Sequence, residues 1–142
     1  WCAQHDEVTL KPALARAYEL PSISGSESVG IVSTLMLVEN PSAEVKNAVK
    51  AAMEWFDSAK IVGYTTQNTG NDVIVVPSAG NIMWARFYDL NTGLPFFCGR
   101  DGIKKNTLAE IEVERRTGYA WYGNWPSKIT NSYNSWKAKH GL

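Results

Sequence analysis

Two arginines, Arg86 and Arg100, lie in an aromatic-rich segment, Trp84–Gly102, whose composition is typical of short β-strands. The guanidinium fork of arginine binds a carboxylate through two hydrogen bonds, and aromatic rings stack on flat faces. A third arginine, Arg16, lies upstream in the run Ala15–Ser22. Together these residues predict a binding site for planar anions. The alternative interpretation is that the arginines form internal ion pairs in a packed hairpin.

The chain as a whole has the composition of one globular domain. Its 142 residues are 44% apolar and carry no net charge. A chain of this length buries about two thirds of its unfolded surface, so we expect a single domain over residues 1–142. No run of Lys and Arg resembles a phosphate-neutralising patch, which argues against a nucleic-acid partner. No apolar run approaches the ~20 residues of a membrane span, so no membrane partner is expected.

The cysteines and histidines do not have the spacing of a zinc site. Cys2 and Cys98 could form one disulfide or remain two buried thiols, and the sequence leaves both possibilities open. His5 and His140 stand alone. The chain begins with Trp1 rather than Met, from which we expect that sequence has been removed upstream.

Helices are predicted in the first half of the chain. Ser24 and Glu27 have the spacing of a capping box, and apolar residues at helical spacing follow to about residue 36. Ser42 is the expected N-cap of a second helix that extends to residue 59, with Glu44 in its first turn, where the helix dipole favours a carboxylate.

The rest of the chain alternates between short strands and helices. Four strands are predicted, at residues 61–64, 72–76, 82–88 and 94–97. Two more helices are predicted, from Thr107 to Gly118 and from Ser127 onward, with the aromatic run 119–126 between them as a loop. The expected fold is therefore mainly α, with a small irregular antiparallel β decoration.

Five segments, in order along the chain, resemble the pectate lyases of polysaccharide lyase family ten. They are Trp1–Asp6, Ala15–Ser22, Trp84–Tyr88, Gly99–Gly102 and Glu114–Gly123. The resemblance spans essentially the whole chain. It implies part of an (α/α)3 toroid, secretion from the cell, and calcium-dependent β-elimination on polygalacturonate.

The resemblance also implies roles for four residues. Arg16 matches the arginine that abstracts the C5 proton as a base, and Arg100 is the second choice for that role. Arg86 and Arg100 match arginines that contact uronate carboxylates. Trp1 resembles an aromatic residue near the substrate groove, with core packing as an equal alternative. No role is assigned to the neighbouring arginines at 115 and 116, for which structural pairing is the favoured interpretation.

In the family, this stretch is the C-terminal part of a longer catalytic domain, and the calcium-binding aspartates lie upstream. Asp6 and Asp101 are the nearest carboxylates to the matched motifs, whereas calcium takes roughly six to eight oxygen ligands. One hypothesis is therefore a pectate lyase that is active only with an N-terminal lyase segment as its partner. The alternative is a non-catalytic pectin-binding module derived from a truncated lyase.

Overall fold

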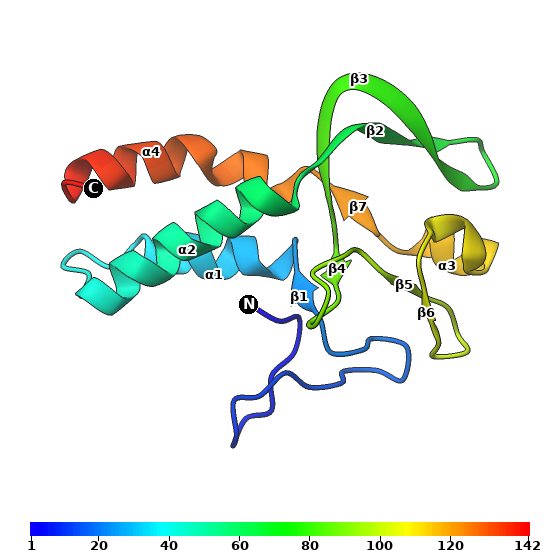
Figure 1. The fold of residues 1–142 in the computed structure, drawn as a ribbon, viewed down its shortest axis with the longest axis horizontal. Coiled ribbons are helices and arrows are strands. Elements are labelled where there is room, and N and C mark those ends of the chain that lie inside the picture. The colour runs from blue at the N-terminus through cyan, green and yellow to red at the C-terminus, as the bar shows by residue number, and fades with distance from the viewer.

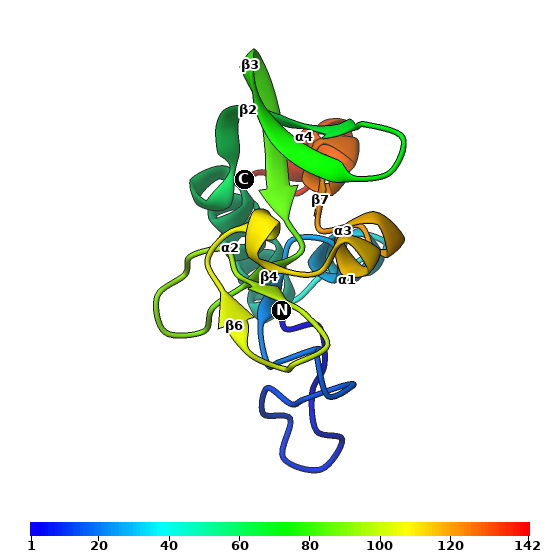
Figure 2. The same ribbon diagram turned by 90° about the vertical axis from the view of Figure 1, so that its right-hand side faces the viewer.

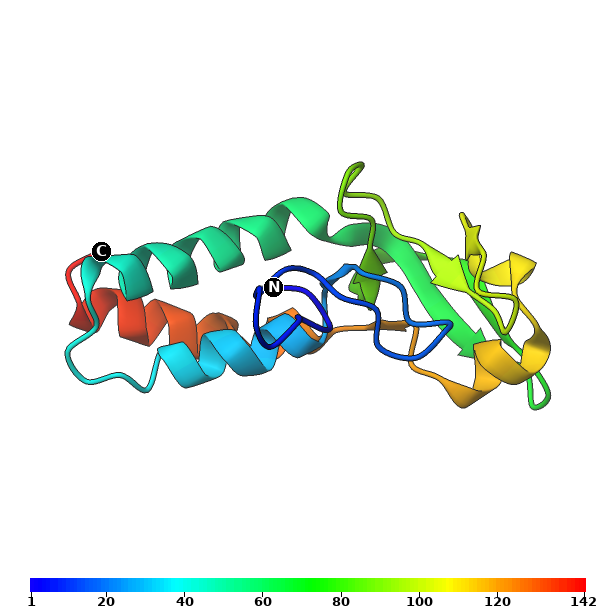
Figure 3. The same ribbon diagram turned by 90° about the horizontal axis from the view of Figure 1, so that it is seen from below.

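Three of the four α-helices lie side by side at one end of an elongated molecule, and the strands and longer loops occupy the other end (Figures 1 and 3). The computed structural model describes residues 1–142. The three helices are α1 (Glu27–Leu35), α2 (Ala43–Ala59) and α4 (Thr130–Lys139). A shorter helix, α3 (Val113–Gly118), lies among the strands.

Local side-chain hydrogen bonds accompany the starts of the first two helices, although the N-cap of α1 is Ser26 and the predicted capping box of Ser24 and Glu27 does not form. The hydroxyl of Ser24 accepts hydrogen bonds from the backbone N–H groups of Ser26 at 3.1 Å and Glu27 at 3.0 Å. The hydroxyl of Ser42 accepts one from the N–H of Val45 at 3.3 Å. Each bond satisfies an amide that the helix itself leaves unpaired. The predicted positions of both helices are confirmed.

The helical end is held together by its own apolar core. Its fully enclosed members come from α1, α2, α4 and the 3₁₀ turn η2 (Trp125–Ile129), and they are Val32, Val49, Phe56, Ile129 and Trp136. None of the helices combines the length and apolar character that crossing a membrane requires.

The strands form three antiparallel sheets. Their bounds are β1 (Ile23–Ser24), β2 (Ile61–Asn68), β3 (Val73–Ala85), β4 (Phe87–Tyr88), β5 (Phe97–Cys98), β6 (Lys104–Lys105) and β7 (Tyr122–Gly123). The sheets are β1–β4, β2–β3–β7 and β5–β6. The β2–β3 ribbon lies on one side of the molecule and the N-terminal segment on the opposite side (Figures 1 and 2).

The expectation of a mainly α fold, part of an (α/α)3 toroid, is wrong. The chain is 35% helix and 25% strand, and its four helices do not form a ring. The β2–β3 ribbon is far longer than the predicted strands because its ladder continues through an irregularity next to Gly63. Gly63 and Gly80 adopt positive φ values of 86° and 76°, which interrupt the alternating pattern without ending the pairing.

Two further predictions along the chain are corrected. The predicted helix from Thr107 to Gly118 is split into the 3₁₀ turn η1 (Leu108–Glu110) and α3. Glu112 separates them, with an extended backbone at φ −62° and ψ 147°. The aromatic loop contains β7, which pairs with β3 through Trp84 and Gly123.

A second apolar core lies beneath the arginine-bearing segments. It consists of Phe87, Phe96, Phe97, Cys98, Leu108, Ile111 and Trp121. Cys2 and Cys98 are both buried free thiols, so no disulfide joins them. Trp84 connects the strand end to the helical end, because its indole N–H donates to the backbone oxygen of Phe56 at 2.7 Å.

Candidate functional site

The side chains of Arg16, Arg86 and Arg100 converge on one row of aromatic rings, and a fourth arginine, Arg115, lies within it. Tyr18 forms one part of the row. The guanidinium carbons of Arg16, Arg100 and Arg115 lie 5.1, 5.0 and 4.4 Å from the centroid of its ring. At these distances a cation is attracted to the ring face. One phenol ring therefore gathers three arginines from separate parts of the chain.

Tyr119 continues the row beyond Tyr18. The guanidinium carbon of Arg115 lies 5.1 Å from its ring centroid and that of Arg86 lies 4.8 Å away. Trp125 ends the row, with Arg86 at 5.8 Å from its ring. We call Arg16, Arg86, Arg100, Arg115 and these three rings the arginine row.

Backbone hydrogen bonds fix Arg86 at the crossing of three segments. Its N–H donates to the carbonyl of Trp121 at 2.7 Å, and its own carbonyl accepts from the N–H of Gly25 at 3.0 Å. Arg86 therefore joins the start of α1 to the chain leading into β7. Gly25 is required there, because a Cβ at this position would approach the backbone oxygen of Ala85 to 2.3 Å.

The other arginines come from a loop, a turn and a short helix. Arg16 lies in the N-terminal loop, where the N–H of Glu19 donates to the Arg16 carbonyl at 2.8 Å. Arg100 follows β5, and its backbone N–H donates to the Glu112 carboxylate at 3.1 Å. Arg115 lies in α3, and its carbonyl accepts from the indole N–H of Trp121 at 2.8 Å.

Each of the three arginines predicted from the sequence also has an internal carboxylate partner. The Nε of Arg16 donates to Glu19 at 2.8 Å, and the Nε of Arg86 donates to Glu27 at 3.1 Å. Arg100 donates to Glu114 through Nη2 at 2.6 Å and Nε at 3.2 Å. The two interpretations of these arginines, a convergent cluster and internal ion pairs, therefore both hold in part.

The pairs of Arg16 with Glu19 and of Arg100 with Glu114 favour the charged forms of their members. The hydrogen bonds to Arg16 hold the pKa of Glu19 below its ordinary value, and Arg100 does the same to the pKa of Glu114. Hydrogen bonding to Glu19 also raises the pKa of Arg16. A guanidinium in this environment holds its proton more firmly than a free one, which opposes its use as a base.

Arg115 differs from the other three because it has no carboxylate partner. The residue is 5% exposed, and its Nε and Nη2 atoms have no hydrogen-bond partner. Its neighbour Arg116 shows the pairing expected for both residues. Arg116 donates to Asp72 through Nε at 2.8 Å and Nη2 at 2.7 Å. The expected structural pairing therefore holds for Arg116 and is wrong for Arg115.

Sequence reasoning missed Arg115, although a signal was present. Arg115 lies four residues before Tyr119, the first residue of the aromatic run, although Tyr119 itself lies beyond the end of α3 in an extended conformation at φ −145° and ψ 141°. The aromatic run after Gly118 was therefore the feature that could have distinguished Arg115 from Arg116. At the other end of the row, the closeness of Tyr18 to Arg16 in the sequence was the feature that could have indicated a contact between an arginine and an aromatic ring.

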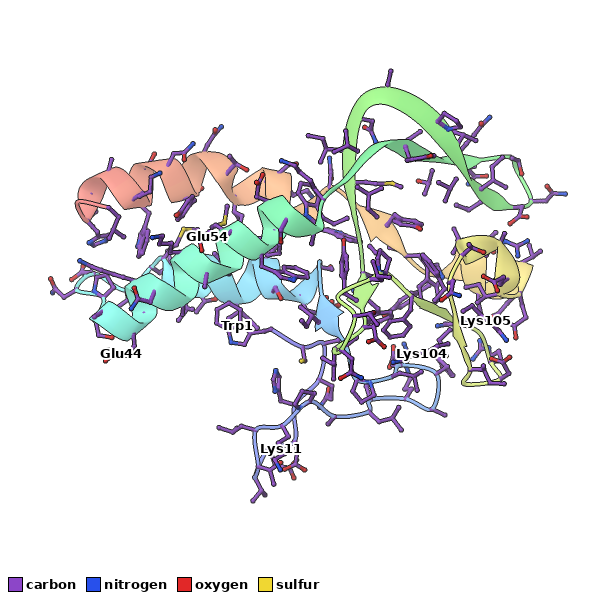
Figure 4. All side chains as sticks on the ribbon, in the orientation of Figure 1. Trp1, Lys11, Glu44, Glu54, Lys104 and Lys105 are labelled. Carbon is purple, nitrogen blue, oxygen red and sulfur yellow. The ribbon has the colours of Figure 1, made fainter.

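Trp1 does not lie in the arginine row. Its side chain is 37% exposed and lines a separate apolar pocket with Trp55 and the alanines of α2, and none of the four arginines lines that pocket. Figure 4 shows Trp1 beneath α2. The terminal amino group donates to the hydroxyl of Ser28 at 2.9 Å. The structure therefore does not bring Trp1 together with the arginines.

The carboxylates present do not fit a calcium site. No group of three or more His, Cys, Asp and Glu side chains is placed to hold a metal ion. Asp6 accepts the backbone N–H of Thr9 at 2.7 Å. Asp101 accepts the N–H of Ile103 at 3.0 Å and pairs with Lys105 at 3.2 Å. Both acids are thus used in local turns rather than gathered around a cation.

Comparison with known proteins identifies what this arrangement resembles. Residues 1–130 match the model of a family described as pectic acid lyase. A family 10 polysaccharide lyase from Cellvibrio cellulosa is 46% identical with a TM-score of 0.88, and the match covers 95% of this chain and 42% of that one. A mutant of that lyase in complex with trigalaturonic acid matches equally well, over 43% of its chain. The chain thus spans less than half the length of these structures. None of the curated proteins matched.

Proposed function

The chain belongs to the pectic acid lyase family, and on this premise we propose that its arginine row binds polygalacturonate and contributes to its β-eliminative cleavage. The mutant lyase in complex with trigalaturonic acid supports an acidic sugar oligomer as the ligand class. Pectin is an extracellular polymer, so we propose that this protein is secreted from the cell.

One observation carries this proposal, the buried guanidinium of Arg115. Its Nε and Nη2 atoms have no hydrogen-bond partner but are enclosed. A carboxylate bound at the more exposed Arg100 would therefore interact with this charge through space. Arg100 and Arg115 share the ring of Tyr18, so an anionic oligomer meets several forks along one row. The tyrosine and tryptophan rings offer flat faces for sugar rings.

The same groups suit the chemistry of pectate cleavage. The reaction removes the C5 proton, which is α to a carboxylate, and expels the sugar linked at C4. Charge then accumulates on a group that is already anionic. Guanidinium groups on that carboxylate stabilise the developing charge. We assign this role to Arg86, Arg100 and Arg115.

We assign proton abstraction to Arg16, which requires its neutral form. The contact with Glu19 favours the charged form, so the base must lose this contact or gain positive charge nearby. Calcium is the cation that the family resemblance implies. Because the acids of this chain do not fit a calcium site, we place its ligands in an N-terminal lyase segment outside this chain.

A second function is favoured by the pKa of Arg16. Since Glu19 raises that pKa, the chain by itself holds Arg16 in the charged state that binds carboxylates rather than the neutral state that abstracts protons. A non-catalytic pectin-binding module would use the row in this state.

One experiment separates the two functions. The chain is incubated with polygalacturonate and calcium at alkaline pH, and the ultraviolet absorbance of unsaturated uronides is followed. A signal that is lost in Arg16→Ala and kept in Lys139→Ala supports the lyase, since Lys139 is an exposed cation near the far end of α4. No signal, with retarded migration in a pectin-containing native gel, supports the binding module. If the chain gives neither an absorbance signal nor retarded migration, both proposed functions are contradicted.

A further inference from the structure

The three ion pairs of the arginine row differ in how firmly their carboxylates are held. The Glu19, Glu27 and Glu114 side chains are 13%, 37% and 64% exposed. Only the pair of Arg100 with Glu114 has both side chains more than half exposed. Exposed pairs of this kind contribute little to stability, because water competes for both partners.

Glu19 and Glu27 are also fixed by a second contact that Glu114 lacks. The Glu19 carboxylate accepts the backbone N–H of Arg16 at 3.1 Å, and the Glu27 carboxylate accepts the hydroxyl of Ser24. The Glu114 carboxylate accepts hydrogen bonds from Arg100 alone. Of the three carboxylates paired with the arginine row, Glu114 is therefore the one most easily displaced from its arginine.

Arg100 keeps its place when Glu114 leaves. Its backbone N–H is held by Glu112 at 3.1 Å, and its guanidinium lies 5.0 Å from the ring centroid of Tyr18. That ring also carries Arg115, whose guanidinium has unused donors. A carboxylate arriving at Arg100 thus meets a fork that is already positioned beside a second cation.

This inference rests on the proposed function and assigns a regulatory contact within the same site. We propose that Glu114 is a built-in competitor of the substrate. Its carboxylate occupies the fork of Arg100 in the free protein and gives way to a uronate carboxylate on binding. No covalent step is involved, because one carboxylate replaces another. The measured affinity is then lower than the intrinsic affinity of the open fork.

The test is the affinity for trigalacturonic acid, measured by calorimetry at low salt in the wild-type chain and in Glu114→Gln. The expected gain in affinity is up to about fivefold. Glu54→Gln is the matched control. Glu54 is 67% exposed and pairs with Lys50 on α2, away from the row (Figure 4). The Glu54→Gln variant loses the same negative charge as Glu114→Gln, so its affinity shows the general effect of net charge on binding.

Tighter binding by Glu114→Gln than by Glu54→Gln supports the proposal. Equal or weaker binding overturns it, because Glu114 would then position Arg100 instead. The gain must also vanish when Arg100→Ala is present, since the competitor acts only through that fork. No binding by the wild-type chain would instead contradict the proposed function itself.

Discussion

The guanidinium of Arg115 lies 4.4 Å from the ring centroid of Tyr18, although 97 residues separate them in sequence. This contact joins the N-terminal loop to α3 and places a buried, unpaired cation in a row of three paired ones. The site is therefore formed by segments that are remote in the chain.

Replacing Arg115 should separate binding from stability. Arg115→Met removes a buried charge that has no ion pair or hydrogen-bonded acid, so the midpoint of thermal unfolding should change by no more than about 2 °C. Affinity for trigalacturonic acid should fall more than about tenfold, because the row loses a positive charge beside Arg100. Circular dichroism melting and calorimetry measure the two effects.

The neighbouring substitution Arg116→Met is the matched control. Arg116 has two bonds to Asp72, so its loss should lower the midpoint of unfolding by roughly 5 °C and leave affinity nearly unchanged. An equal loss of stability in both variants would mean that Arg115 is structural.

The ring of Tyr18 should matter more than its hydroxyl. Tyr18→Leu removes the face shared by three guanidinium groups, so affinity for the trimer should fall by about tenfold. Tyr18→Phe keeps that face and should bind within about twofold of the wild-type chain. Equal weakening in the two variants would show that the hydroxyl, not the ring, organises the arginines.

Glu19→Gln should shift the pH dependence of any lyase activity. Glu19 raises the pKa of Arg16, so its removal should lower that pKa and increase the neutral fraction at a given alkaline pH. The rising limb of the rate against pH should therefore move to lower pH. A rate that falls at every pH without a shift would indicate that Glu19 only positions Arg16.

Methyl esterification of the substrate should weaken binding. The ester removes the negative charge that the arginine forks recognise, so the free acid should bind more tightly, by about tenfold or more at low salt. Added salt should narrow the difference, because it screens exposed charges. Gel retardation with pectins of graded esterification gives the comparison. Equal retardation by all of them would contradict carboxylate recognition.

Stability should fall on acidification below about pH 4. Hydrogen bonding to Arg116 holds the pKa of Asp72 below its ordinary value of 3.8. The unfolded chain therefore takes up the proton first as the pH falls, which destabilises the folded state. Thermal melts between pH 7 and about pH 3 should show a falling unfolding midpoint in the wild-type chain. The midpoint should fall less over the same range in Asp72→Asn. If the midpoint of Asp72→Asn depends on pH as steeply as that of the wild-type chain, a group other than Asp72 is responsible.

The local features and the family can be read from the order of residues alone. Ser42 caps the helix predicted after it because capping depends on neighbours within three residues, whereas the N-cap of α1 is Ser26 rather than the predicted Ser24. The five motifs identified a pectate lyase relative, which the family match confirms, and they named three of the four arginines in the row.

Contacts between distant segments determine how these parts combine. The balance of helix and strand depended on the long pairing of β2 with β3 across Gly63, which no local pattern shows. Glu112 interrupts the helix predicted after Thr107, and its side chain binds the backbone of Arg100 twelve residues away. Whether an arginine has a partner is likewise a property of distant segments. Arg116 meets Asp72 and Arg115 meets only aromatic rings, although the two are adjacent in the chain.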